Sequence, residues 1–138
     1  MRLICDTNIL LDVICRREPF YTDSACVLNM CEDGDVEGMI TVTSLSDLFY
    51  ITRRLFSDKE KAYEALDLAT KILKPCTVSD ADAIRAIKEK GKDFEDAMIA
   101  YAAESNDCDY VITRNTSDFE GLPVKAIEPS QLLDLFML

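Results

Sequence analysis

The sequence of 138 residues contains no histidine. This absence excludes serine and cysteine nucleophile systems that rely on an imidazole base, and it excludes zinc sites built from histidine ligands. Any chemistry in this chain must therefore use carboxylates, lysine, hydroxyls, thiols or a hard metal ion.

Long apolar runs are also missing. No stretch approaches the ~20 residues needed to cross a bilayer, and the first twelve residues, MRLICDTNILLD, place acids where a signal peptide would be apolar. The six cysteines form no CxxC pair, so the sequence indicates neither a zinc site nor a disulfide framework. We expect buried free thiols, no membrane partner and a cytoplasmic location.

The chain has few basic residues, with 15 Lys and Arg against 26 Asp and Glu and a net charge of -11. This balance argues against a protein that coats nucleic acid through bulk electrostatics, because phosphate binding depends on clustered cations. It leaves room for a local basic patch. The candidates are Arg16, Arg17, Arg53, Arg54 and Arg114.

Apolar runs and helix caps predict one α/β domain spanning residues 1–138. Short apolar strands are predicted at 2–5, 38–44, 76–79, 109–113 and 123–127. Helices are predicted between them, with starts at Asn8, Thr22, Ser44, Ser57, Asp80, Phe94 and Pro129. Strands without polar alternation that alternate with helices are typical of a mostly parallel sheet of about five strands covered on both faces.

Four aspartates are expected at the carboxyl ends of the strands, where ligands bind in open parallel sheets. They are Asp6, Asp47, Asp96 and Asp118. Each also has a purely structural interpretation: Asp47 and Asp96 lie three residues after Ser44 and Asp93, as in a capping box. We interpret Asp12, Asp33, Asp58 and Asp82, near predicted helix ends, as structural or solvated.

Asp6 is harder to explain as a cap, because a carboxylate directly after a core strand is costly to bury unless it is paired or bound to metal. Asp96 shares a helical turn with Asp93 and Glu95, so like charges are crowded there. Carboxylate-rich sites favour Mg²⁺ or Mn²⁺. Such a cation is the usual equipment for phosphodiester hydrolysis without histidine.

Three blocks, CDTNILLD, FEDAMIAYAA and DYVITRNTSDF, resemble in order and spacing the signature of the PIN domain family, which includes the VapC-like ribonuclease toxins. The block SLSDLFYITRR falls where the second acidic block of the family belongs. The resemblance implies a three-layer α/β/α sandwich with a mostly parallel central sheet.

The resemblance also implies roles for individual residues. Asp6 and Asp96 would be the principal Mg²⁺ or Mn²⁺ ligands, and Asp118 would complete the site directly or through water. Which of Asn115 and Asp118 is the nearer ligand stays open. Asp47 stands where VapC-like members usually carry glutamate, so it would reach the metal through water or bind a second ion.

The supporting residues implied by the resemblance surround these acids. Thr113 and Asn115 would orient water or phosphate, and Thr7 and Asn8 would add contacts beside Asp6; Asp93 is expected to support the site from the cap of the helix that carries Asp96. Arg114 is either a phosphate contact to RNA or an exposed cation at a strand end.

The function implied is that of a metal-dependent endoribonuclease that cleaves single-stranded RNA with a metal-activated water. It would be the toxin of a toxin-antitoxin pair, with an antitoxin protein and a second copy of itself as partners. An alternative is a PIN-like binding or regulatory module with a degraded site. A third, a carboxylate phosphatase with Asp6 as nucleophile, fits less well because position 8 is asparagine and not an acid.

Overall fold

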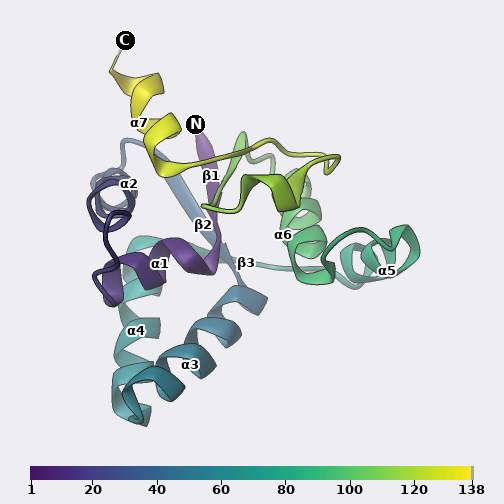
Figure 1. Cartoon of the computed structure of the whole chain (residues 1–138). Coiled ribbons are helices and arrows are strands. Elements are labelled where there is room, and N and C mark those ends of the chain that lie inside the picture. The colour runs from purple at the N-terminus through teal and green to yellow at the C-terminus, as the bar shows by residue number, and fades with distance from the viewer. Residues whose placement is uncertain (138) are drawn as a thin grey trace.

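A parallel sheet with helices on both faces organises the chain (Figure 1). The computed structural model describes residues 1–137, and within them the sheet has five strands and the chain seven α-helices. The strands are β1 (Arg2–Cys5), β2 (Glu37–Thr41), β3 (Lys74–Cys76), β4 (Tyr110–Ile112) and β5 (Ala126–Ile127). The helices are α1 (Thr7–Ile14), α2 (Tyr21–Asp33), α3 (Val42–Phe56), α4 (Lys59–Ile72), α5 (Asp80–Glu89), α6 (Phe94–Ser105) and α7 (Pro129–Phe136), with a short 3₁₀ helix η1 (Thr116–Phe119).

The strands lie in the order β3-β2-β1-β4-β5, and every neighbouring pair is parallel. Strand β1 is therefore central, with Ile4 paired to Met39 of β2 and to Val111 of β4. The carboxyl ends of β1, β2 and β4 meet at one edge. This edge is where the sequence predicts a site, and the predicted parallel α/β fold is confirmed.

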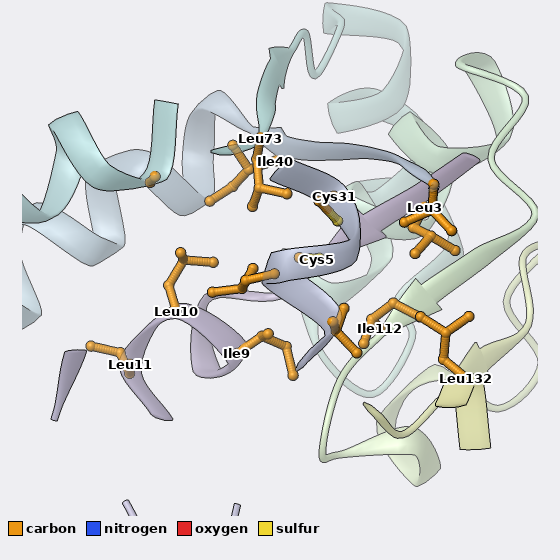
Figure 2. Close-up of a cluster of buried hydrophobic side chains, with 14 of the residues drawn as sticks. Leu3, Cys5, Ile9, Leu10, Leu11, Cys31, Ile40, Leu73, Ile112 and Leu132 are labelled. Carbon is orange, nitrogen blue, oxygen red and sulfur yellow. The ribbon is translucent and has the colours of Figure 1, made fainter. Parts of the chain in front are cut away.

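Each face of the sheet has its own apolar core. On one face, Ile9 of α1, Ile112 of β4 and Leu132 of α7 point into a common cluster that also receives α2 and α4 (Figure 2). On the other face, α6 covers Ile4 and Val111. Figure 1 shows α6 and α5 on the opposite side of the sheet from α1, α2 and α4.

Helix α3 begins earlier than the sequence predicts. Strand β2 ends at Thr41, and the Oγ1 of this residue accepts a hydrogen bond from Ser44 N at 3.1 Å, so Thr41 and not Ser44 is the N-cap. The last residue of the strand caps the helix directly, which is why no loop separates them. Asp47 consequently lies beyond the first turn of α3, and its interpretation as a capping residue is wrong.

Two other helix starts also differ. Helix α2 has Phe20 and not Thr22 at its N-cap, with no side-chain hydrogen bond, because the preceding residues already form a turn. Helix α4 is capped by Asp58, whose carboxylate accepts from Glu60 N at 2.9 Å, while Ser57 adopts a left-handed conformation with φ 51°. The structural interpretation of Asp58 is therefore confirmed.

The third strand is predicted at 76–79, but β3 starts two residues earlier, at Lys74, and ends at Cys76. Ser79 instead caps α5, and Asp82 completes the capping box, since its Oδ2 accepts from Ser79 N at 3.1 Å. The structural interpretation of Asp82 is thereby confirmed. At the end of the chain, Leu132 is fully buried whereas Phe136 is exposed. The predicted terminal helix runs to Phe136, and Leu138 lies outside the described residues.

All six cysteines are free, and four of them are buried. Cys26 is exposed and Cys15 is half-buried, so the prediction of buried thiols is wrong for these two. Over residues 1–137, none of the helices is both long and apolar enough to cross a membrane.

Of the four glycines, Gly38 of β2 is the one that has no room for a side chain, and it provides a test of the fold. A Cβ there would lie 2.5 Å from Cys31 Sγ and 2.6 Å from Leu73 Cδ2. We expect Gly38→Ala to lower the free energy of unfolding by about 1–3 kcal/mol, because overpacking displaces neighbouring side chains. Urea unfolding measures the change.

Gly91→Ala is the matched control. A Cβ at Gly91 meets no atom within 4 Å, so this variant should unfold at or above the wild-type urea concentration. Equal stability of the two variants would contradict the packing described at Gly38.

Candidate active site

Asp6 lies directly after the central strand and is the N-cap of α1. Its backbone N–H donates to Ile112 O of β4 at 2.9 Å, which extends the ladder between the two strands by one bond. The residue is only 8% exposed. The sequence expectation that this carboxylate is desolvated at the end of a core strand is thus confirmed.

Neutral donors surround the Asp6 carboxylate. Thr7 N donates to Oδ1 at 2.7 Å, Thr113 Oγ1 donates to Oδ2 at 2.9 Å, and Asn8 Nδ2 lies 3.3 Å from Oδ2. Burial raises the pKa of Asp6, and the bonds from Thr113 and Thr7 oppose that shift; the nearby Asp93 and Asp47 raise the pKa further. Within the described residues 1–137, the carboxylate therefore has hydrogen-bond donors but no cationic side chain paired with it.

Thr113 links the two segments that form the site. Besides donating to Asp6, its Oγ1 accepts from Asn115 N at 3.1 Å and lies 3.3 Å from Asn8 Nδ2. Thr113 is fully buried, whereas Asn115 is exposed. The loop after β4 is thereby tied to the start of α1.

Helix η1 carries Asp118, which is half-buried. Its backbone N–H donates to Asn115 O at 3.1 Å. Asp118 and Asp93 line a cavity of about 190 Å³ between η1 and the start of α6. Phe119, the next residue, is buried in the core.

The first turn of α6 brings further acids to the same edge. Asp93 is the N-cap, and its Oδ1 accepts from Asp96 N at 2.9 Å, so its predicted capping role is confirmed. The side chain of Asp96 is half-buried, and its pKa rises to about 7 through burial and through the charges of Asp6, Asp93 and Asp118.

Glu95 is the acid that the sequence did not single out as a site residue. A hydrogen bond with Asp47 is the largest cause that raises the pKa of Glu95 to about 8; burial and the charges of Asp47, Asp6 and Asp96 add to it. The pair joins the first turn of α6 to α3. Crowding of like charges at 93–96 was the only local signal, and it could not reveal a partner nearly fifty positions away.

The predicted acids thus influence one another electrostatically at the carboxyl edge of the sheet. Their side chains are not yet arranged as metal ligands. Within residues 1–137, no three Asp, Glu, His or Cys side chains lie close enough together to hold a metal ion. Coordination would therefore require side-chain rotation. All the potential donors are oxygen atoms, which suit Mg²⁺ or Mn²⁺.

Arg114 is paired with Asp12 and is not an exposed strand-end cation. Its Nε contacts Asp12 Oδ2 at 2.8 Å, and its side chain is 21% exposed. Asp12 itself lies within α1 and is completely buried. Of the two interpretations offered for this residue, the structural one is therefore confirmed, and Asp12 is not solvated.

The raised pKa values predict how stability depends on pH. In an unfolded chain Glu95 and Asp96 titrate near ~4, whereas in the folded protein they hold protons up to about pH 8 and about pH 7. Between these limits the folded state binds more protons, so the free energy of unfolding falls as pH rises through about pH 4–8. Urea unfolding without divalent cations measures this slope.

Glu95→Gln removes one titrating group and should reduce the loss of stability between about pH 5 and about pH 8. Glu32→Gln replaces an exposed carboxylate on α2 and should keep the wild-type slope. A wild-type slope in Glu95→Gln would show that this carboxylate is not held in a protonated pair.

Comparison with known proteins places this geometry in context. A sequence profile of the PIN domain matches residues 2–117. No curated protein matches the sequence. Among solved structures, the fold is similar to that of DNA-bound VapBC from Salmonella typhimurium, with 20% identity, a TM-score of 0.71, and coverage of 94% of this chain and 98% of that one.

Two further structures are similar. VapBC2 from Rickettsia felis, bound to a DNA fragment from its promoter, has 19% identity and a TM-score of 0.70 and covers 93% of this chain and 98% of its own. VapC20 from Mycobacterium tuberculosis, a toxin that cleaves the sarcin-ricin loop, has 11% identity and a TM-score of 0.64 over 79% of this chain and 86% of its own. At these identities the likeness establishes the fold.

Proposed function

The chain belongs to the PIN domain family, and from that premise we propose that it is a metal-dependent endoribonuclease that cleaves single-stranded RNA. The observation that carries the proposal is the excess of negative charge at the carboxyl edge of the sheet. Burial and neighbouring acids raise the pKa of Asp6, of Glu95 to about 8 and of Asp96 to about 7. A divalent cation would relieve this repulsion.

The residues fit a hard cation in chemistry. Asp6, Asp96 and Asp118 would hold it, and all three offer carboxylate oxygens at one edge of the sheet. Thr7 adds a buried hydroxyl oxygen that has no hydrogen-bond partner among residues 1–137. When bound, Mg²⁺ or Mn²⁺ would activate water and neutralise charge on the phosphoryl group.

The chain's own residues would prepare the site. Thr113 and Thr7 keep the Asp6 carboxylate in one orientation, and Asp93 takes the capping position so that the Asp96 side chain is left for a ligand. Asn115, the N-cap of η1, and Asp118, within η1, are the two candidates for a further ligand from the loop after β4. Asp47, which is the largest influence on the raised pKa of Glu95, would act with that residue from the α3 side.

Toxin-antitoxin function is the biological setting that the comparisons support. The similar structures from Salmonella typhimurium and Rickettsia felis are VapBC complexes. We therefore infer an antitoxin protein partner for this chain, RNA as its substrate and a cytoplasmic location, and we retain the prediction of a homodimer. Growth arrest on expression, relieved by Asp96→Asn, would support the toxin assignment.

A binding or regulatory module is the second candidate. It is favoured by the pairing of Asp47 with Glu95 and by the lack of a ready three-ligand cluster within residues 1–137. Calorimetry with Mn²⁺ separates the two candidates, because a degraded site would show neither binding heat nor metal-dependent cleavage of mixed RNA substrates.

Asp96→Asn tests the nuclease proposal directly. We expect cleavage of a defined RNA pool with Mg²⁺ or Mn²⁺ to fall by on the order of 100-fold or more, because the carboxylate would be a ligand and loss of even an outer partner of a metal site costs about 10–100-fold. Asp6→Asn should behave alike.

Asp67→Asn, at an exposed position on α4, is the control and should cleave as the wild type does. Activity that persists at the wild-type level in Asp96→Asn, or that resists a chelator, would count against a metal-dependent nuclease.

A further inference from the structure

We propose that Asp12 and Arg114 are positioning residues: their ion pair clamps the loop after β4 to α1 and so keeps the Thr113 hydroxyl on the Asp6 carboxylate. The catalytic part of this inference rests on the proposed nuclease function. The clamp itself does not depend on that function, because it concerns only how two segments that are 102 positions apart are held together.

Besides the contact between Asn8 Nδ2 and Thr113 Oγ1, three contacts join the same two segments. Thr113 Oγ1 donates to Asp6 Oδ2 at 2.9 Å, Arg114 N lies 3.5 Å from Asn8 Oδ1, and Arg114 Nε contacts Asp12 Oδ2 at 2.8 Å. The first two contacts lie at the start of α1, at Asp6 and Asn8, and the third lies further along the helix, at Asp12. The ion pair therefore fixes the direction of the loop as well as its distance from α1.

The pair is locked in place from the side of α2. Ser24 Oγ donates to Asp12 Oδ2 at 3.1 Å, and the guanidinium of Arg114 lies over the ring of Phe20, 4.1 Å from its centroid. An arginine held by a carboxylate and an aromatic ring loses its rotational freedom. Because Arg114 directly follows Thr113, fixing its side chain also fixes the backbone that carries the threonine hydroxyl.

Stability alone does not account for this arrangement. Asp12 is completely buried, and in the described part of the chain its Oδ1 has no hydrogen-bond partner. A buried ion pair is commonly no more stabilising than apolar side chains of similar volume. The hydrogen-bonded ion pair, in contrast, has a defined direction, so it can hold the loop in one orientation, which apolar packing does not do.

The alternative role of Arg114 is the direct phosphate contact that the sequence suggested. The two roles predict different kinetics. If Arg114 binds phosphate, Arg114→Gln would raise KM for RNA, and substitution of Asp12 would matter little. If the two residues form a clamp, substitution of either would lower kcat, because the Asp6 carboxylate would no longer be oriented, while KM would change little.

The decisive variant is Asp12→Leu/Arg114→Met, which removes both charges together and leaves apolar side chains in their place. It avoids an unpaired buried charge, so it should fold where Asp12→Asn or Arg114→Gln alone could fail to do so. We expect a urea midpoint near that of the wild type, with kcat lowered by about 10–100-fold as for other outer partners of metal sites and with KM unchanged.

Amide hydrogen exchange gives a readout that needs no enzymatic activity. In the double variant we expect exchange in residues 113–119 to be at least about tenfold faster than in the wild type, because the loop is no longer held, while α6 keeps its protection. If the wild type does not cleave RNA, the nuclease proposal is wrong. The exchange experiment still tests the clamp, because it does not depend on cleavage.

The Arg85–Glu104 pair is the matched control. It has the same 2.8 Å contact and the same 4.1 Å placement of a guanidinium over an aromatic ring, here Tyr101, but it joins α5 to the far end of α6. Arg85→Met/Glu104→Leu should keep wild-type kcat and loop exchange. The clamp would be overturned if Asp12→Leu/Arg114→Met kept the loop exchange of the wild type, or if the wild type cleaves RNA and the double variant kept its kcat. A change in KM alone would assign Arg114 to phosphate binding.

Discussion

Burial of the Asp6 carboxylate is the constraint on which the rest of the site depends. The central strand delivers this residue to the edge of the sheet at 8% exposure, where an ionised group must find donors or lose its charge. Thr113, from the neighbouring strand, supplies one donor, and the backbone of α1 supplies another. The pairing of β1 with β4 is therefore specified by side-chain chemistry at its end as well as by the backbone ladder.

Helix capping and ligand binding are compatible uses of the acids at the start of α6. Three acids occupy positions 93, 95 and 96, and the structure divides the roles among them. Asp93 accepts a hydrogen bond from the backbone N–H of Asp96 and so caps the helix. Asp47 raises the pKa of Glu95, and the charges of Asp6, Asp93 and Asp118 raise that of Asp96. A structural role for one acid thus leaves its neighbour available for chemistry.

Local signals predicted the order and type of the helices and strands, because apolar runs, caps such as Asp93 and the parallel-sheet rule act within short windows or through topology. They failed where a cap residue belongs to the preceding strand, as with Thr41, and where a partner is distant in sequence. The contact between Asp12 and Arg114 spans 102 positions, and that between Asp47 and Glu95 depends on how α3 and α6 are oriented. No short window contains this information.

The two buried carboxylates of this region show why Asp6, and not Asp12, is assigned to a cation. Both lie at or in α1 and both are shielded from water. Asp12 has a guanidinium at 2.8 Å, so its charge is balanced within the protein. Asp6 receives only neutral donors, and its acidic neighbours Asp93 and Asp47 raise its pKa. A carboxylate held in orientation by the fold but left without a counter-charge is suited to a positive ion from outside the chain, whereas a carboxylate already paired with arginine is suited to holding the loop in place.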